Sequence, residues 1–459
     1  MERKAARGME RRRFLKRAAM WAGGAATTSA LAACAPQGAG DTGAAKLPDT
    51  PVTIRLPNSD PTPTNDQYFA QVMSRVKDKY GDKIRLFNEP WLGSWQERYE
   101  KWLSQAIAGD APDVMWLCCE LLRPYFTSGN ALALDGYVKR DWKKGEADDF
   151  YKGMWEGMQL DKKQYAIPVY ANTPAIFINQ TLFKEGGLTA PPEDWNGTKF
   201  LDYATKLNRR DADRWGFMMS NYNQPNRHVL FVWAWGGEVH DPKDGPLVTR
   251  LTYDNPKTVE ALQFIHDLIW KHRVAPPNDA ARGGIGAQAA FEQGKAAVYL
   301  DGSHVTGAFL RRQQQEASFD WDIAMPVVGP TGGKGARIGN DGYMIWKGSK
   351  NVEAAWTVIK ELYSPEIQKA RAEITASRPA VKSAQVHWEK QFPGKNMKAM
   401  RLLGETARPD PNAYWKDSAT VNAIIVKHLQ STFERNEVTV GEAVSRLMTE
   451  IRGYYASAK

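Results

Sequence analysis

The sequence is poor in the residues that form redox and metal sites. It has three cysteines and seven histidines in 459 residues, and it contains no CxxC pair. Cys118 and Cys119 are neighbours, and neighbouring cysteines rarely bridge because a disulfide favours well-separated Cα atoms. The P-loop, the HExxH helix and the GxSxG elbow are also absent from the sequence. The sequence therefore indicates no disulfide framework, and we predict no metal, no cofactor and no catalytic residue.

The N-terminal apolar stretch, residues 18–33, is too short and too weakly apolar for a membrane span of about 20 residues. Residues 11–16, Arg-Arg-Arg-Phe-Leu-Lys, resemble the twin-arginine export signature, although Glu10 stands where Ser or Thr is usual. Leu31-Ala-Ala-Cys34 resembles a lipobox, whose cysteine carries diacylglycerol and becomes the new N-terminus. We therefore predict a signal peptide over 1–33, lipidation at Cys34 and a flexible tether over 34–50.

The net charge of +9 is concentrated in this export signal. Residues 1–34 hold eight basic and two acidic residues, so they carry six of the nine positive charges and the rest of the chain carries three. A weakly basic body gives no reason to expect nucleic acid as a partner. The remaining chain is long enough for two domains. Its 17 Trp and 17 Tyr are many for an exported protein of this size, and they suggest sugar binding.

Short apolar runs alternate with helical segments, which predicts an α/β fold. We predict strands at 52–56, 86–87 and 114–117, with a helix between each pair. This βαβαβ order implies a parallel sheet, with ligands near the carboxyl ends of its strands. Thr439 and Glu442 have the spacing of a capping box and predict the start of the last helix.

Several sequence pieces then follow one another in the order found in one family. They are 111–114 (APDV), 165–168 (YAIP), 182–188 (LFKEGGL), 233–238 (WAWGGE), 291–297 (FEQGKAA), 339–342 (GNDG) and 354–356 (AAW). In this order the chain resembles the family 1 extracellular solute-binding proteins, which include maltodextrin- and oligosaccharide-binding proteins. The resemblance runs from about Val52 to Tyr454.

The resemblance implies a fold and a role. The fold would be α/β and two-lobed, the type II periplasmic-binding-protein fold, with a ligand cleft between the lobes and three hinge crossings. The crossings would fall near 168–172, 339–342 and 375–381. The first lobe would comprise 51–168 plus 343–377. The second lobe would comprise 169–342 plus 378–459. The chain would be an extracytoplasmic, lipid-anchored binding protein and not an enzyme. It would act as a monomer, capture a sugar or oligosaccharide and deliver it to the membrane permease subunits of an ABC importer.

Candidate ligand residues lie at the ends of predicted strands, in loops and at the crossings. Carboxylates and amides satisfy sugar hydroxyls, and aromatic rings pack against sugar C–H faces. The candidates are Asn58, Trp91, Glu120, Tyr170, Asn172, Trp233, Trp235, Ser303, Asp341 and Arg378. Trp95 is an alternative to Trp91, one of Trp233 and Trp235 is expected in the core, and Tyr414 and Trp415 are weaker candidates. His304 stands where some maltodextrin-binding relatives have a stacking Trp, which argues against maltodextrin itself.

Two other functions remain open. An exported glycosidase would need two carboxylates facing each other across one bond, and no motif suggests such a pair. A different solute would change the lining of the cleft. A glycerol phosphodiester would require several Arg or Lys, for which the sequence offers Arg378, and a polyamine would require several carboxylates beside aromatic rings. The Trp count favours an oligosaccharide.

Overall fold

The computed structural model describes residues 47–57, 62–89, 93–278, 286–339 and 341–457, which belong to one compact unit, 42–459. The predicted signal peptide, Cys34 and the tether up to residue 46 lie outside the described residues, as do Asn58 and Trp91. No helix within these described ranges is long and apolar enough to cross a bilayer.

The predicted strands of the first lobe all form, but they do not make one parallel sheet. β1 (Val52–Pro57) and β2 (Ile84–Glu89) are parallel neighbours joined by α2 (Pro63–Tyr80). β3 (Val114–Leu117) instead pairs antiparallel with β12 (Gly342–Ile345), which also pairs with β6 (Ile167–Pro168). The prediction of a three-stranded parallel sheet was wrong because the chain returns to this lobe late and places β12 beside β3.

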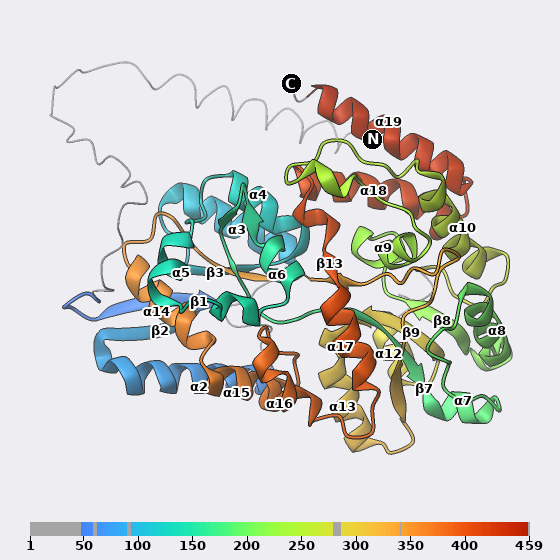
Figure 1. Ribbon diagram of the computed structural model, residues 1–459, viewed down its shortest axis with the longest axis horizontal. Coiled ribbons are helices and arrows are strands. Elements are labelled where there is room, and N and C mark those ends of the chain that lie inside the picture. The colour runs from blue at the N-terminus through green and yellow to red at the C-terminus, as the bar shows by residue number, and fades with distance from the viewer. Residues whose placement is uncertain (1–46, 58–61, 90–92, 279–285, 340, 458–459) are drawn as a thin grey trace, which may run out of the picture. The chain divides into compact units, whose positions relative to one another are not determined.

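Helices cover this lobe on several sides (Figure 1). They are α3 (Trp95–Ala108), α4 (Leu122–Thr127), α5 (Asp135–Asp141), α6 (Lys152–Gly157), α14 (Val352–Leu362) and α15 (Pro365–Thr375). α3 ends at Gly109, whose positive φ of 80° suits a glycine. Ile54, Val114 and Trp356 are fully buried in one apolar cluster, so segments far apart in the sequence share one core.

The second lobe is built on a four-stranded sheet in the order β10-β7-β9-β8. β7 (Pro174–Asn179) runs antiparallel to β9 (Ala296–Gly302) and β10 (Trp321–Ala324), whereas β8 (Trp215–Met219) is parallel to β9. The main helices are α7 (Gln180–Glu185), α8 (Gly197–Leu207), α9 (Pro225–Ala234), α10 (Pro256–Trp270), α12 (Gly286–Glu292), α13 (Thr306–Gln315), α17 (Met397–Thr406), α18 (Ser418–Phe433) and α19 (Val440–Ser457) (Figure 1).

The capping box predicted for the last helix is confirmed. Thr439 N donates to Glu442 Oε2 at 2.9 Å, and Glu442 N donates to Thr439 Oγ1 at 3.2 Å. The two bonds satisfy backbone donors that a helix start leaves free, so α19 begins where the sequence predicts.

The three predicted crossing segments lie side by side. Val169 N donates to the Asp341 carbonyl at 2.8 Å, and Gly339 N donates to the Asn172 carbonyl at 2.6 Å. Ala171 N donates to the Arg378 carbonyl at 3.1 Å. The segment 169–172 therefore lies between the other two and is hydrogen-bonded to both.

The apolar clusters do not separate sharply at residue 377, because Ala372 and Ala376 pack with the second lobe while Ala380 and Val381 pack with the first.

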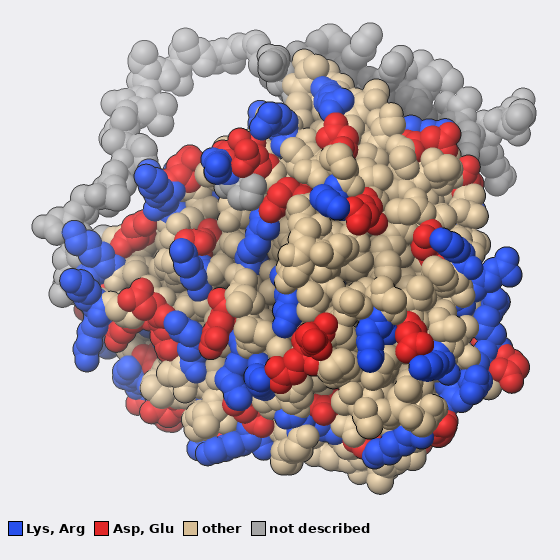
Figure 2. Space-filling model, turned by 45° about the vertical axis from the view of Figure 1, so that its right-hand side comes forward, with Lys and Arg blue, Asp and Glu red and all other residues tan. Residues whose placement is uncertain are grey.

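Basic and acidic side chains are interspersed over the face that Figure 2 shows. Many of them pair on the surface, for example Lys398 with Glu193 at 2.7 Å and Arg452 with Asp254 at 2.6 Å. Such exposed ion pairs each stabilise the fold by about 1 kcal/mol at most.

Candidate functional site

A cavity of about 610 Å³ lies between the lobes, where the crossing segments meet. The first lobe contributes Thr62, Thr64, Asn65, Trp95, Trp116, Cys118 and Glu120; the second contributes Asn221, Gln224, Asn226, Arg227, His304, Gly307, Ala308, Arg311 and Arg337; the crossings and α15 contribute Tyr170, Asn172, Gly339, Asp341, Arg371, Thr375 and Ser377. The volume suits a small-molecule ligand, and a ligand held here would touch both lobes.

Aromatic side chains form one wall of this cavity. The Trp116 ring meets Trp95 edge to face at a centroid distance of 6.0 Å and Tyr170 at 6.1 Å. Tyr343 packs against the same indole at 5.7 Å. Trp116 is almost fully buried, whereas Trp95 and Tyr170 are partly exposed. The wall can therefore offer ring surface to an apolar face of a ligand, and its position is fixed from behind.

Two ion pairs, one fully buried and one partly buried, support the second-lobe wall. Arg337 Nη1 donates to Asp410 Oδ2 at 2.7 Å, and both side chains are at most 2% exposed. Arg227 Nη2 lies 2.6 Å from Asp301 Oδ1. In each pair the arginine lines the cavity, and the carboxylate is not among the lining residues. A buried arginine needs such compensation because an unpaired buried charge is costly.

Glu120 follows β3 and lines the cavity, as its place after a strand suggests. Burial raises the pKa of its carboxyl, and the nearby negative charge of Asp410 adds to this shift. Its backbone carbonyl accepts a 2.6 Å hydrogen bond from Ser418 Oγ, and Arg123 of the adjacent helix donates to the Ala413 carbonyl. The C-terminal part of the chain thus holds this corner of the first lobe in place.

Asp341 lies at the second crossing and is 3% exposed. Burial raises the pKa of its carboxyl to about 7, although Trp116 and Arg337 act in the opposite direction. The carboxyl can therefore carry a proton near neutral pH and donate a hydrogen bond into the cavity.

Of the described candidates, Glu120, Tyr170, Asn172 and Asp341 all lie on the cavity wall. His304, also on the wall, has its Nδ1 3.5 Å from Asn172 Oδ1. These residues come from four separate parts of the chain and meet where the first two crossings lie side by side.

Ser303 and Arg378 lie behind the wall and support the first crossing. Ser303 Oγ donates to the Ala171 carbonyl at 3.0 Å, and Arg378 Nε donates to Gln385 Oε1 at 2.8 Å. Arg378 also donates to the hydroxyl groups of Thr173 and Tyr151. Both side chains are at most 1% exposed, and neither is among the residues that line the cavity. Their polar groups are already satisfied by the protein.

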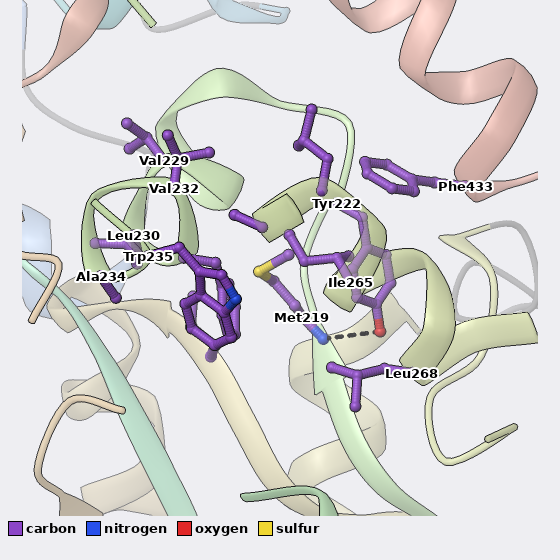
Figure 3. Close-up of a cluster of buried hydrophobic side chains, with 14 of the residues drawn as sticks. Met219, Tyr222, Val229, Leu230, Val232, Ala234, Trp235, Ile265, Leu268 and Phe433 are labelled. Atoms are coloured by element: carbon purple, nitrogen blue, oxygen red, sulfur yellow. Dashed lines mark hydrogen bonds between the residues drawn. The ribbon is translucent and has the colours of Figure 1, made fainter. Parts of the chain in front are cut away.

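Trp233 and Trp235 do not line the cavity either. Trp235 lies in an apolar cluster with Leu230 and Ile265 (Figure 3), and its ring packs against Phe264 at 4.7 Å. The Trp233 ring is covered by the Arg408 guanidinium at 4.1 Å. The structure does not place either indole at the cavity, because both are buried in the second-lobe core while α9 faces the cavity with Asn226 and Arg227. Tyr414 and Trp415 are likewise outside the wall, and Trp415 is fully buried beside His240.

Sequence reasoning missed Trp116 and the arginines of the wall. Trp116 lies inside a predicted buried strand, where an indole looks like an ordinary core residue. Arg371 gave a clearer signal, because Ile367, Arg371 and Ala372 fall on the core-facing side of α15. An arginine on such a face needs a partner or a ligand, and this pattern can be read from the sequence. Within the described residues, no group of three or more His, Cys, Asp or Glu could hold a metal ion.

Comparison with known proteins identifies the family. The family model of the bacterial extracellular solute-binding proteins matches residues 61–369, more than half of the chain. The galactooligosaccharide-binding protein of Bacillus subtilis is 25% identical over 305 residues, 66% of this chain and 67% of that protein. A protein of Brucella abortus named only as a binding protein is 26% identical over 59% of this chain. The match spans 63% of that relative's length, which is less than two thirds.

An ABC substrate-binding protein of Listeria monocytogenes, solved in complex with cycloalternan, has the same fold. It aligns with a TM-score of 0.74 over 88% of this chain and 98% of that one, at 20% identity. The chain belongs to the bacterial extracellular solute-binding proteins, a family of binding proteins that work outside the cytoplasm. The two-lobed α/β fold predicted from the sequence is confirmed.

Proposed function

We propose that this protein captures a carbohydrate, an oligosaccharide in particular, and delivers it to the permease of an ABC importer. The observation that carries the proposal is the cavity between the lobes, in which an aromatic wall faces amide, hydroxyl and carboxyl groups. A sugar has the matching surfaces, since its hydroxyls lie around the ring edge and its C–H groups above and below. The names of the Bacillus and Listeria proteins give the same class of ligand.

We assign the ligand contacts to residues from both lobes and the crossings. Trp95, Trp116 and Tyr170 supply ring surface, while Glu120, Asn172 and Asp341 supply polar groups. A ligand that touches both lobes stabilises the closed arrangement by its greater affinity for that state. The closed protein then docks on the permease, and binding itself requires no bond to be made or broken.

The first test is a thermal-shift screen of the purified protein against neutral oligosaccharides, glycerol phosphodiesters and polyamines. A ligand that binds only the folded state stabilises it and so raises the melting temperature. At a ligand concentration of 100 times Kd the stabilisation is about 2.7 kcal/mol. We expect a shift with an oligosaccharide series. A shift with polyamines alone would contradict the carbohydrate assignment and leave the transport role.

Replacing Trp95 with alanine is expected to weaken oligosaccharide binding about tenfold. The change removes a partly exposed ring from the cavity wall, and such an aromatic contact contributes about 1 kcal/mol or more. Titration calorimetry gives the change in Kd. Trp346→Ala is the matched control, because Trp346 is a partly buried indole of the same lobe outside the cavity wall. Equal Kd values for wild type and Trp95→Ala would remove Trp95 from the site.

We further propose that the protein is exported by the twin-arginine route and anchored through lipid on Cys34. The support is the sequence alone, Arg11-Arg12-Arg13-Phe14-Leu15-Lys16 followed by Leu31-Ala-Ala-Cys34. Replacing Cys34 with alanine is expected to move the protein from the membrane fraction to the soluble extracytoplasmic fraction, because the acyl chains supply the attachment. Immunoblots of fractionated cells measure this. An unchanged membrane share for Cys34→Ala would rule out the anchor.

A further inference from the structure

Two arginines of the cavity have no carboxylate partner. Arg371 on α15 is 4% exposed, and its Nη2 donates only to the hydroxyl groups of Tyr68 at 3.0 Å and Tyr343 at 3.4 Å. Its Nε is buried without a hydrogen-bond partner. Arg311 on α13 is exposed at the cavity, and neither arginine has an ion pair with any of the described residues.

The two arginines lie at the same end of the cavity. Thr375 follows Arg371 by one helical turn, and its Oγ1 donates to the Arg371 carbonyl at 2.7 Å. Gly307 precedes Arg311 by one turn, and a Cβ added to Gly307 would lie 2.7 Å from the Thr375 carbonyl. α13 and α15 are therefore in close contact at this point, with one arginine on each. All four residues line the cavity.

The first turn of α2 reaches the same end. The Arg371 guanidinium stacks over the ring of Tyr68 on this helix, with 4.4 Å from its carbon to the ring centroid. Thr62, Thr64 and Asn65 at the start of α2 line the cavity as well. A helix start carries partial positive charge from its free N–H groups, which adds to the charge of the arginines.

The charges of the cavity wall do not cancel. Asp410 neutralises Arg337 and Asp301 neutralises Arg227. The two carboxyl groups that line the cavity belong to Glu120 and Asp341, and burial raises the pKa of both. Among the described residues neither carboxyl forms an ion pair with Arg311 or Arg371, so neither neutralises these two arginines directly. The wall has an excess of positive charge, which disfavours a polyamine.

We infer that the ligand of this cavity carries an anionic group, a carboxylate or a phosphate on a polyhydroxylated body, and that Arg311 and Arg371 bind it. The inference rests on the proposed function, because it specifies the ligand of the same cavity. A guanidinium matches either anion through two parallel N–H bonds. The ligand would also compensate the buried charge of Arg371.

Matched ligands test this inference by titration calorimetry on the purified protein. Oligogalacturonate and the neutral galactose oligomer of equal length differ only in a carboxylate in place of a CH₂OH group on each sugar. Glycerophosphoglycerol and diglycerol differ only by a charged phosphodiester in place of the ether oxygen that joins the two glycerols, and inorganic phosphate tests the anion without a polyhydroxylated body. We expect one acidic ligand to bind about 10- to 100-fold more tightly than its neutral partner, the range of charge-assisted hydrogen bonds.

Arg311→Gln is the main variant because its side chain is exposed and has no ion pair to lose. It is expected to weaken binding of the acidic ligand much more than binding of its neutral partner, and so to remove most of the advantage of the acidic ligand. Arg312→Gln is the matched control, since Arg312 is the next residue on α13, pairs with Glu316 and does not line the cavity. Arg371→Lys tests the second arginine, with its melting temperature measured to separate loss of binding from loss of fold.

The outcomes separate the two proposals. Preference for the uronate oligomer, lost in Arg311→Gln, supports both and identifies a carboxylate. Preference for the phosphodiester with the same loss supports the anionic site and overturns the oligosaccharide. A neutral oligomer that binds as tightly as its acidic partner overturns the inference alone. Binding of polyamines, or of none of these probes, overturns both the anionic site and the carbohydrate assignment, and binding of inorganic phosphate alone overturns the need for a polyhydroxylated body.

Discussion

Asp410→Asn is expected to lower the free energy of unfolding by about 3–5 kcal/mol, the usual cost of removing one partner of a buried ion pair. Asp410 is fully buried, and it neutralises Arg337, which is 2% exposed. The amide keeps the shape of the side chain but leaves the guanidinium without a counter-charge. Urea unfolding followed by circular dichroism measures the change.

The matched control for this experiment is Glu193→Gln. Glu193 pairs with Lys398 at 2.7 Å on the surface, where the side chains are about two-thirds exposed. An exposed pair contributes little to stability because solvent screens it, so this variant should remain near wild type. Replacing Arg337 with Met in the Asp410→Asn background is expected to recover part of the loss, because the unpaired charge is then gone. A loss under about 1 kcal/mol for Asp410→Asn alone would show that Arg337 is compensated in another way.

Asp341→Asn is expected to stabilise the unliganded protein increasingly as the pH rises. The pKa of Asp341 is about 7 in the folded protein, above its ordinary value near 4. Between pH 4 and pH 7 the carboxyl ionises freely in the unfolded chain but is held protonated in the folded one. The folded wild type therefore loses stability as the pH rises through this window, and the loss levels off above pH 7.

Asparagine cannot ionise, so the variant escapes this loss. The difference in unfolding free energy between Asp341→Asn and wild type should grow by about 4 kcal/mol between pH 4 and pH 8, since one pKa unit equals about 1.4 kcal/mol. Trp116, Arg337, Arg371 and Asp410 are the neighbours that act on this carboxyl. Asp211→Asn on the exposed surface is the control. A difference that does not change with pH would mean that Asp341 is ionised throughout this range.

Local patterns predicted the local structure well. The capping box at Thr439 and Glu442 placed the start of its helix, because this motif acts within one turn of the chain. The strand at 114–117 was predicted at its exact bounds. Its pairing was not, because its partner β12 lies more than 200 residues further along the chain and no local signal connects the two.

The cavity could be predicted only in part. Glu120 follows a predicted strand, and Asp341 lies at a predicted crossing. The resemblance to the family placed both positions near the ligand, so both residues were chosen as candidates. Trp233 and Trp235 were chosen for their residue type, but an indole serves a core as well as a binding site, and exposure decides between the two. Arg371 was missed because a helix pattern shows which face is buried and does not show that the buried face also borders a cavity.

The support given to Glu120 by Ser418, and to Arg337 by Asp410, has a consequence for synthesis on the ribosome. The cavity wall begins at Thr62, yet two of its supports, Asp410 and Ser418, are translated much later. A nascent chain that stops before Asp410 holds Arg337 without its counter-charge, so it cannot complete the wall. The supported wall is therefore complete only once residues 410 and 418 have been made and packed, so a fully supported cavity reports that the chain has folded at least this far.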